Sequence, residues 1–185
     1  MVPAMTQALV IVDIQNDYFP GGANPLEGPE AAADQARLLL QSFRLRGLEV
    51  VHIQHVWDAV DATFMVPGSA GVEINERVAP ADGEQVFAKA HPNAFLETPL
   101  ESHLREREID ELVVCGMMTS MCVDATVRAA VDLGFSTAVA HDACATMALE
   151  FDGRSIPAAD VHAAFLAALG EGYAQVAAAD ELVRR

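Results

Sequence analysis

Residues 111–133, ELVVCGMMTSMCVDATVRAAVDL, place a strand, a short turn and a helix in direct succession. The apolar run at residues 111–115 has the length of a buried strand. Residues 121–133 predict a helix, and Gly134 is the kind of residue that closes one. A strand that passes through a turn into a helix is the repeating unit of parallel α/β sheets, so this stretch indicates the fold class.

The rest of the chain repeats this alternation. Residues 8–12 (ALVIV) are continuously apolar, as in a strand buried on both faces. With no repeat or linker in 185 residues, we expect one α/β domain spanning residues 1–185: a three-layer sandwich with a six-stranded parallel sheet flanked by helices. The further predicted strands are residues 49–54, 85–88, 136–140 and 173–176, and the further predicted helices are residues 30–46, 98–107 and 157–169.

Charge and composition narrow the function classes. Eleven Lys and Arg against 27 Asp and Glu give a net charge of -16, which repels phosphate backbones, so we expect no nucleic-acid partner. No apolar run reaches membrane-spanning length, so we expect no membrane partner either. A small-molecule substrate remains the expected partner.

The cysteines and the N-terminus favour a cytoplasmic location. Three cysteines, an odd number, fit a reducing compartment in which thiols stay free. Residues 1–12 contain no basic region and no clear cleavage site, so we expect no signal peptide. Met5 is an alternative start to Met1.

Three chemically useful side chains follow predicted strands: Asp13, Lys89 and Cys122. Ligands bind beyond the carboxyl ends of parallel strands, where the strand order reverses. Burial can raise the pKa of Asp13 toward that of a general base, and a helix N-terminus at Cys122 favours a thiolate and can bind an oxyanion. Each residue also has a structural interpretation: a loop-capping Asp, a surface Lys and a small buried Cys.

The other two cysteines are weaker candidates for the nucleophile. Cys115 lies inside a predicted strand, which fits a buried structural thiol, and Cys144 follows the fifth predicted strand. From the residues alone, the chain is a candidate thiol hydrolase.

Three motifs, in order, resemble the isochorismatase-like cysteine hydrolase superfamily. VDIQNDY at residues 12–18, with Phe19, is similar to its D-x-Q-N-D-F opening, and KAHPNAF at residues 89–95 is similar to its K-x-x-x-[SN]-A-F segment. CGMMTSMCVDATVRAAVDLGF at residues 115–135, followed by HDAC, resembles its long cysteine signature. The resemblance covers nearly the whole chain.

This resemblance implies a fold and a mechanism. It implies a six-stranded parallel sheet flanked by helices and a catalytic triad of Asp13, Lys89 and Cys122. It also implies a cis peptide bond between Met117 and Met118, with the N–H groups of Met118 and Cys122 as the oxyanion hole. Asp13 would take the thiol proton, and Cys122 would attack a carbonyl carbon to form a thioester that water hydrolyses.

Departures from the family pattern narrow the chemistry. Metal-dependent nicotinamidases carry an Asp-x-His pair that is missing here, so we expect no metal and no other cofactor. His55 and Trp57 are therefore expected to line the pocket. The isochorismate-cleaving branch lacks the nucleophilic cysteine, so cleavage of an amide, ureido or lactam C–N bond is favoured. The predicted substrate-binding residues are Gln15, Phe19, His55, Trp57 and Phe95.

Two other functions stay open: a nicotinamidase-type amidase with an atypical metal site, and a non-catalytic flavodoxin-like binding domain. The second is disfavoured because no Gly-rich phosphate loop follows the first strand. Residues 151–157 with His162 resemble uncharacterised family members and streptothricin hydrolases, which open a lactam; we interpret His162 as a packed residue. The family usually forms dimers or tetramers, so we expect a homodimer or homotetramer.

Overall fold

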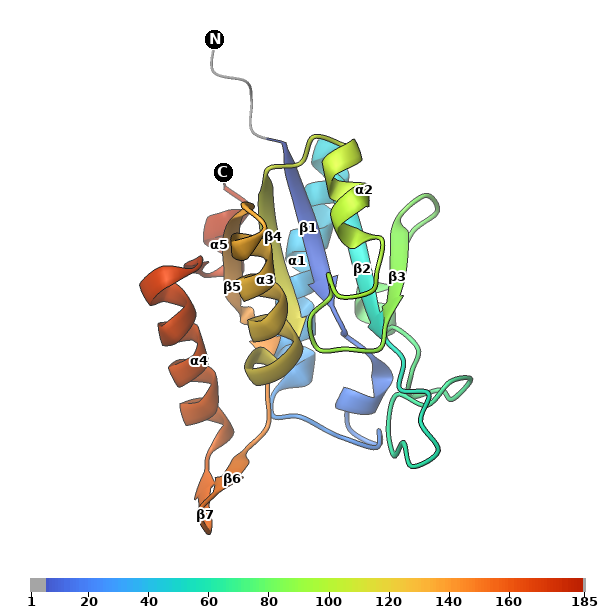
Figure 1. Ribbon diagram of the computed structural model, residues 1–185, viewed down its shortest axis with the longest axis vertical. Coiled ribbons are helices and arrows are strands. Elements are labelled where there is room, and N and C mark those ends of the chain that lie inside the picture. Colours follow the sequence, from blue (N-terminus) through green and yellow to red (C-terminus); the bar gives the residue numbers. More distant parts are fainter. Residues whose placement is uncertain (1–5, 185) are drawn as a thin grey trace.

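The computed structural model describes residues 6–184 of the chain, so the choice between Met1 and Met5 as the start lies outside the described residues. Six strands form one sheet in the order β3-β2-β1-β4-β5-β8 (Figure 1), and every neighbouring pair is parallel. The strands are β1 (Gln7–Val12), β2 (Glu49–His55), β3 (Gln85–Lys89), β4 (Glu111–Met117), β5 (Ser136–Ala145) and β8 (Gln175–Ala177).

Helices cover both faces of this sheet. The α-helices are α1 (Pro29–Arg46), α2 (Leu100–Glu106), α3 (Asp124–Asp132), α4 (Ala158–Gly172) and α5 (Ala179–Leu182). Short helical turns are η1 (Asn16–Tyr18), η2 (Glu76–Val78) and the π-helical η3 (Thr119–Val123), and a separate hairpin consists of β6 (Leu149–Phe151) and β7 (Arg154–Ile156).

Alternate side chains of each strand enter two separate cores. Leu9 and Ile11 of β1 belong to the core that includes α1 and α5, whereas Val10 and Val12 belong to the core that includes α2, α3 and α4. Figure 1 shows the corresponding layers, with α1 on one side of the sheet and α2 and α3 on the other. The three-layer α/β fold expected from the sequence is confirmed.

The strand order reverses at β1, which has β2 on one side and β4 on the other. Connections from β1 and from β4 therefore leave toward opposite faces of the sheet, which opens a crevice at their carboxyl ends. Asp13 follows β1, Lys89 ends β3, and Cys122 follows β4, so the sheet brings these residues to one edge.

Several boundaries differ from the sequence prediction, and two of these differences bear on the site. β5 runs to Ala145 rather than residue 140, because its register with β4 shifts between Val114 and Gly116 and pairing then resumes at Cys144. Cys144 therefore lies inside the strand and not after it. The helix expected at residues 121–133 begins instead as the π-helical turn η3, which continues into α3.

The β6–β7 hairpin was missed at the sequence level. Asp152 and Gly153 connect its strands with positive φ angles of 49° and 71°, the conformation that a two-residue Asp-Gly turn supplies. The Asp-Gly pair was the available signal. The hairpin projects from the lower end of the molecule in Figure 1.

Within residues 6–184, no helix is both long enough and apolar enough to cross a membrane.

Candidate active site

Asp13 is held in an uncommon backbone conformation at the end of β1. Its φ is 50°, in the left-handed region that few non-glycine residues adopt, and its N–H donates to the carbonyl of Ile53 on β2. The residue is fully buried. Backbone strain of this kind persists where the surroundings enforce it, and it concentrates at functional sites.

Gly116 allows β4 to approach the end of β1. It pairs with Val12 and has a φ of 134°, and a Cβ at this position would overlap the Val12 carbonyl. Only glycine fits without moving β1. The chain then passes through a cis peptide bond between Met117 and Met118 into the turn that carries Cys122.

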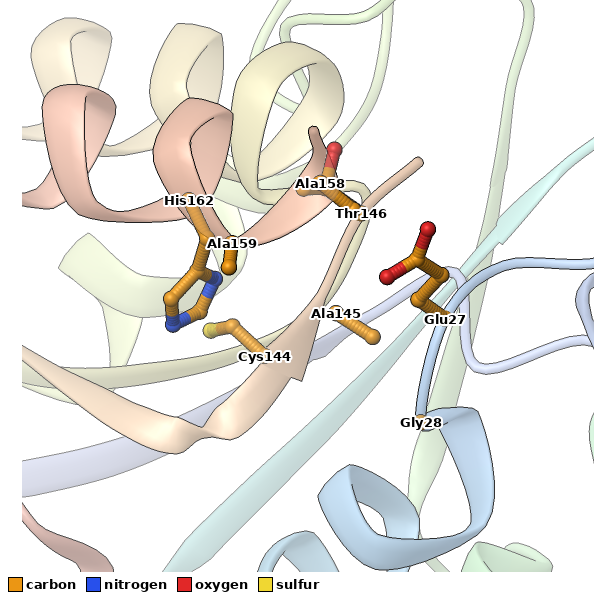
Figure 2. Close-up of a pocket in the computed structure, with 8 residues that line it drawn as sticks. All are labelled: Glu27, Gly28, Cys144, Ala145, Thr146, Ala158, Ala159 and His162. Atoms are coloured by element: carbon orange, nitrogen blue, oxygen red, sulfur yellow. The ribbon is translucent and has the colours of Figure 1, made fainter. Parts of the chain in front are cut away.

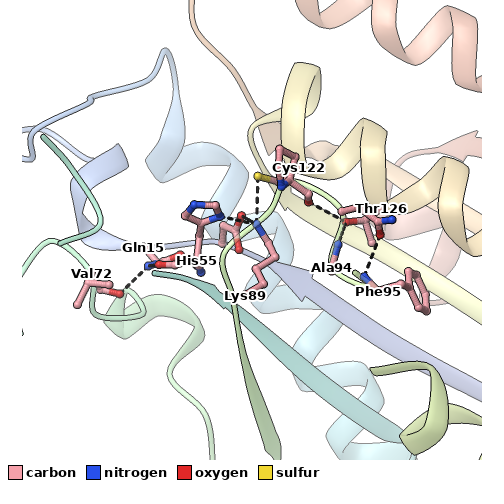
Figure 3. Close-up of polar contacts among 11 residues, drawn as sticks. Gln15, His55, Val72, Lys89, Ala94, Phe95, Cys122 and Thr126 are labelled. Carbon is pink, nitrogen blue, oxygen red and sulfur yellow. Dashed lines mark hydrogen bonds and ion pairs between the residues drawn. The ribbon is translucent and has the colours of Figure 1, made fainter. Parts of the chain in front are cut away.

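Lys89 lies at the centre of the site (Figure 3). Its Nζ is 2.7 Å from Oδ2 of Asp13, 2.8 Å from Nδ1 of His55 and 3.2 Å from Sγ of Cys122. The side chains of Lys89 and Asp13 are both inaccessible to solvent. An ammonium group removed from water is stable only with such partners, so these contacts explain how a lysine can be the buried last residue of the edge strand β3.

Burial opposes ionisation of the Cys122 thiol. Removal from water and the nearby Asp13 carboxylate raise the pKa of Cys122, and the Lys89 ammonium only partly opposes them. These effects oppose the lowering of a thiol pKa that a helix N-terminus favours. The nucleophile needs a base to take its proton.

Asp13 is placed to be that base. Burial raises the pKa of Asp13, while the charge of Lys89 and its hydrogen bond lower it. A carboxylate oxygen of Asp13, Sγ of Cys122 and a ring nitrogen of His55 all lie within 4.8 Å of one another. A carboxylate whose basicity is increased next to a thiol can accept the thiol proton.

The same three groups have the composition of a metal site, but Lys89 occupies their centre. Its Nζ contacts all three residues, so the Lys89 ammonium group already occupies the position that a metal ion would need. His55 serves as an uncharged acceptor for this ammonium, because burial and the Lys89 charge lower the pKa of His55 to about 4. These residues therefore fit an internal cation better than a metal.

A cavity of about 270 Å³ opens directly above Cys122. It includes His55 and Trp57, as the sequence predicted, and also Tyr18 and Phe64, which the sequence reasoning missed. Phe64 lies in an irregular segment with no periodic pattern; its only signal is an aromatic residue beyond a strand end. The lining residues are Tyr18, His55, Trp57, Phe64, Ala90, Pro92, Met118, Met121 and Cys122.

Gln15, Phe19 and Phe95 do not line this cavity. Gln15 is buried and holds the end of β2: its Oε1 accepts from the His55 N–H at 2.8 Å, and its Nε2 donates to the His55 carbonyl at 2.8 Å. It therefore positions His55. Phe19 is buried beside Arg77, and the partly buried Phe95 stacks on Phe135 and packs against the core that includes α3.

A second cavity, of about 330 Å³, lies on the other side of the turn and includes Cys144 and His162 (Figure 2). Nδ1 of His162 is 2.9 Å from Oγ1 of Thr119, the first residue of the turn that carries Cys122. The Cys144 thiol donates to the Ala140 carbonyl at 3.3 Å. His162 therefore forms part of the wall of this cavity, which differs from the packed position expected from the sequence, and it also contacts the turn that carries Cys122.

Comparison with known proteins gives the family. Residues 7–180 match the Isochorismatase domain. The chain is 49% identical to the uncharacterised isochorismatase family protein YddQ of Bacillus subtilis (strain 168), covering 93% of this chain and 96% of that one. It is 37% identical to streptothricin hydrolase of Streptomyces noursei, covering 95% of this chain and 60% of that protein.

A solved structure of the same family has the same fold. The crystal structure of an isochorismatase hydrolase from Oleispira antarctica superimposes with a TM-score of 0.95 at 50% identity, and all of both chains is covered. The family model spans residues 7–180, and the fold and the sequence agree with it. The chain belongs to the isochorismatase family of hydrolases.

Proposed function

We propose that this hydrolase cleaves a C–N bond of a small amide, ureido or lactam substrate through a thioester on Cys122. One observation carries the proposal: a single buried ammonium, Nζ of Lys89, contacts both the Asp13 carboxylate and the Cys122 sulfur beside a ligand-sized cavity. Such an arrangement supplies a base, a nucleophile and a positive charge that stabilises both of their anionic forms.

The first half of the reaction forms the acyl-enzyme. Asp13 takes the proton of the Cys122 thiol, and the sulfur attacks the carbonyl carbon of the substrate. The N–H groups of Met118 and Cys122 hold the tetrahedral oxyanion; both residues line the cavity into which the carbonyl would enter. The C–N bond then breaks, and Asp13 returns its proton to the leaving nitrogen.

The second half regenerates the thiol. Asp13 takes a proton from water, the resulting hydroxide attacks the thioester carbon, and the oxyanion occupies the same N–H groups. The C–S bond breaks, the acid leaves, and the proton on Asp13 returns to sulfur. Lys89 stays next to both anions throughout. The relative from Streptomyces noursei, a streptothricin hydrolase, supports hydrolytic chemistry for this fold.

A substrate panel tests the proposal. Purified protein is incubated with small primary amides, ureido compounds and lactams, and release of ammonia or amine is measured. At least one compound should be cut by the wild type and not by the Cys122→Ala variant. Turnover that survives in Cys122→Ala would remove the thioester mechanism.

A nicotinamidase with an atypical metal site is the second candidate, because Asp13, His55 and Cys122 can converge on one ion. We expect the contacts of Lys89 to exclude it. Activity should therefore survive prolonged dialysis against EDTA. A rate that collapses with the chelator and returns with zinc, iron or manganese would establish the metal-dependent alternative.

Assembly and location complete the proposal. We propose a homodimer or homotetramer that acts in the cytoplasm on a small-molecule substrate. The protruding hairpin supports assembly, because Phe151 at its tip is 75% exposed and an apolar ring at such a position is commonly covered by a partner. Light scattering at micromolar concentration tests this, and a monomer alone would contradict it.

A further inference from the structure

The cavity above Cys122 is built mainly from aromatic rings and thioethers. Trp57 packs edge-to-face on Phe64, with ring centroids 5.2 Å apart and planes at 79°. The ring centroids of Phe64 and Tyr18 are 6.3 Å apart. Met118 and Met121, which carry thioethers, also line the cavity. Aromatic edges and polarisable thioethers pack favourably against a flat ring.

We propose that this site accepts amides whose acyl group is uncharged and apolar, with a single flat ring as the best fit, and that it rejects acyl groups bearing a carboxylate. The inference rests on the proposed function for its chemistry, since Cys122 forms the wall that the carbonyl must face. The ring then lies toward Trp57 and Phe64, and the leaving nitrogen lies toward Asp13.

The charges around the cavity support this assignment. Among the described residues that line it, none is a lysine or an arginine. His55 is neutral at physiological pH, since its pKa is lowered to about 4. The Lys89 ammonium is already engaged by three partners, and the nearby His91 pairs with Glu97 at 3.1 Å.

A substrate carboxylate would therefore lose water without gaining a partner. The transfer of an unpaired charge into such surroundings is strongly unfavourable. The chain's net charge of -16 adds a long-range repulsion that reduces the encounter rate of anionic substrates. Both effects favour neutral compounds.

The size of the cavity fits a ring with one carboxamide. Its volume is about 270 Å³, whereas an engineered apolar cavity of roughly 150 Å³ suffices to bind benzene. Drug-sized ligands occupy pockets of about 300–1,000 Å³, so the space limits the substrate to a small molecule.

Binding can be measured separately from turnover, because Trp57 is the chain's single tryptophan. Its fluorescence should report occupancy of the cavity in the Cys122→Ala variant. We expect benzamide to change this fluorescence saturably, with a Kd at least about tenfold lower than that of 3-carbamoylbenzoate, the same ring bearing a carboxylate. Equal or tighter binding of 3-carbamoylbenzoate, or no saturable response to benzamide up to about 10 mM, overturns the inference.

Turnover by the wild type is the second measurement that tests this inference. The ratio kcat/KM for benzamide should exceed that for 3-carbamoylbenzoate by about tenfold or more. If only the carboxylated amide acylates Cys122, the proposed function stands and this inference fails. If benzamide binds but no amide acylates Cys122, the proposed function fails while the ligand class of the cavity is retained.

Two variants locate the selectivity. Phe64→Ala should raise KM for benzamide about tenfold, whereas the control Leu45→Ala, at an 89% exposed position near the C-terminal end of α1, should leave it unchanged. Met121 is 47% exposed at the cavity wall, so Met121→Arg should fold normally and improve the binding of 3-carbamoylbenzoate. An unchanged preference for benzamide over 3-carbamoylbenzoate in both Phe64→Ala and Met121→Arg would show that this cavity does not select the acyl group.

Discussion

Two cavities, those beside Cys122 and Cys144, each contain a buried cysteine and a half-buried histidine, yet only the first has a carboxylate and an ammonium group beside its thiol. Burial raises the pKa of both thiols, that of Cys144 to about 12. Cys122 has the Asp13 carboxylate and the Lys89 ammonium beside it, whereas the Cys144 thiol donates to a backbone carbonyl. The comparison teaches that a buried cysteine becomes a useful nucleophile only with a base and a charge partner.

Removal of each thiol in turn should give the largest effect. We expect Cys122→Ala to lower kcat at least about a thousandfold, because no other group replaces the nucleophile. Cys144→Ala and Cys115→Ala should keep most of the activity. Ammonia release and thermal unfolding, measured on all three, check this; similar losses in Cys122→Ala and Cys144→Ala would erase the distinction between the cavities.

Removal of the charge partner should give the next largest effect. Lys89→Met should lower the rate at neutral pH by about a hundredfold or more. Because burial raises the pKa of Asp13 and Lys89 lowers it, the pKa of Asp13 should rise further in the variant. The rate requires ionised Asp13, so it falls as pH decreases, and this acid limb should move to higher pH. The limb reflects a coupled site of Asp13, Lys89 and Cys122; a pH–rate profile with the wild-type acid limb would contradict this role.

The glycine between the two cavities should matter for stability. Gly116 pairs with Val12 on one side and with Cys144 on the other. Gly116→Ala should reduce the free energy of unfolding by about 2–4 kcal/mol, because the added methyl overlaps β1 and the φ of 134° is strained for alanine. Denaturant unfolding measures this. Gly153→Ala, at the exposed hairpin turn, is the comparison, and an equal loss there would indicate that the contact with β1 is unimportant.

The histidine of the second cavity should have the smallest effect. His162→Leu removes the contact with Thr119 at the start of the catalytic turn and should lower kcat roughly fivefold, corresponding to about 1 kcal/mol for a hydrogen bond. KM should stay constant, because His162 does not line the cavity above Cys122. A loss as large as that of Cys122→Ala would place catalysis in the second cavity.

Residues fixed by strand periodicity were predictable, and those fixed by irregular segments were not. Asp13 could be located because a continuous apolar run marks the buried strand that it follows, and Lys89 because it directly follows a short run of strand-forming residues. Phe64 and Tyr18 reach the cavity through a loop and a 3-10 turn, whose paths depend on contacts such as the Asp17 carboxylate accepting from the Met65 N–H. No local pattern encodes such contacts.

The direction in which the pKa of Cys122 shifts was also not predictable. A helix-start position favours a lower pKa, but the depth of burial and the nearby Asp13 carboxylate raise it. These distances arise from the packing of three strands against one turn. Phe95 shows the same limit: its motif pointed to the site, but its ring stacks on Phe135 instead.

Trapping of the acyl-enzyme tests the central claim most directly. The wild type is mixed with a substrate found in the panel, quenched in acid within milliseconds to seconds, digested and analysed by mass spectrometry. We expect the peptide containing Cys122 to gain the mass of the acyl group, with no gain on Cys115 or Cys144 and none in Asp13→Asn. Steady turnover with no acyl group on Cys122, under conditions that preserve a synthetic thioester, would contradict the thioester mechanism.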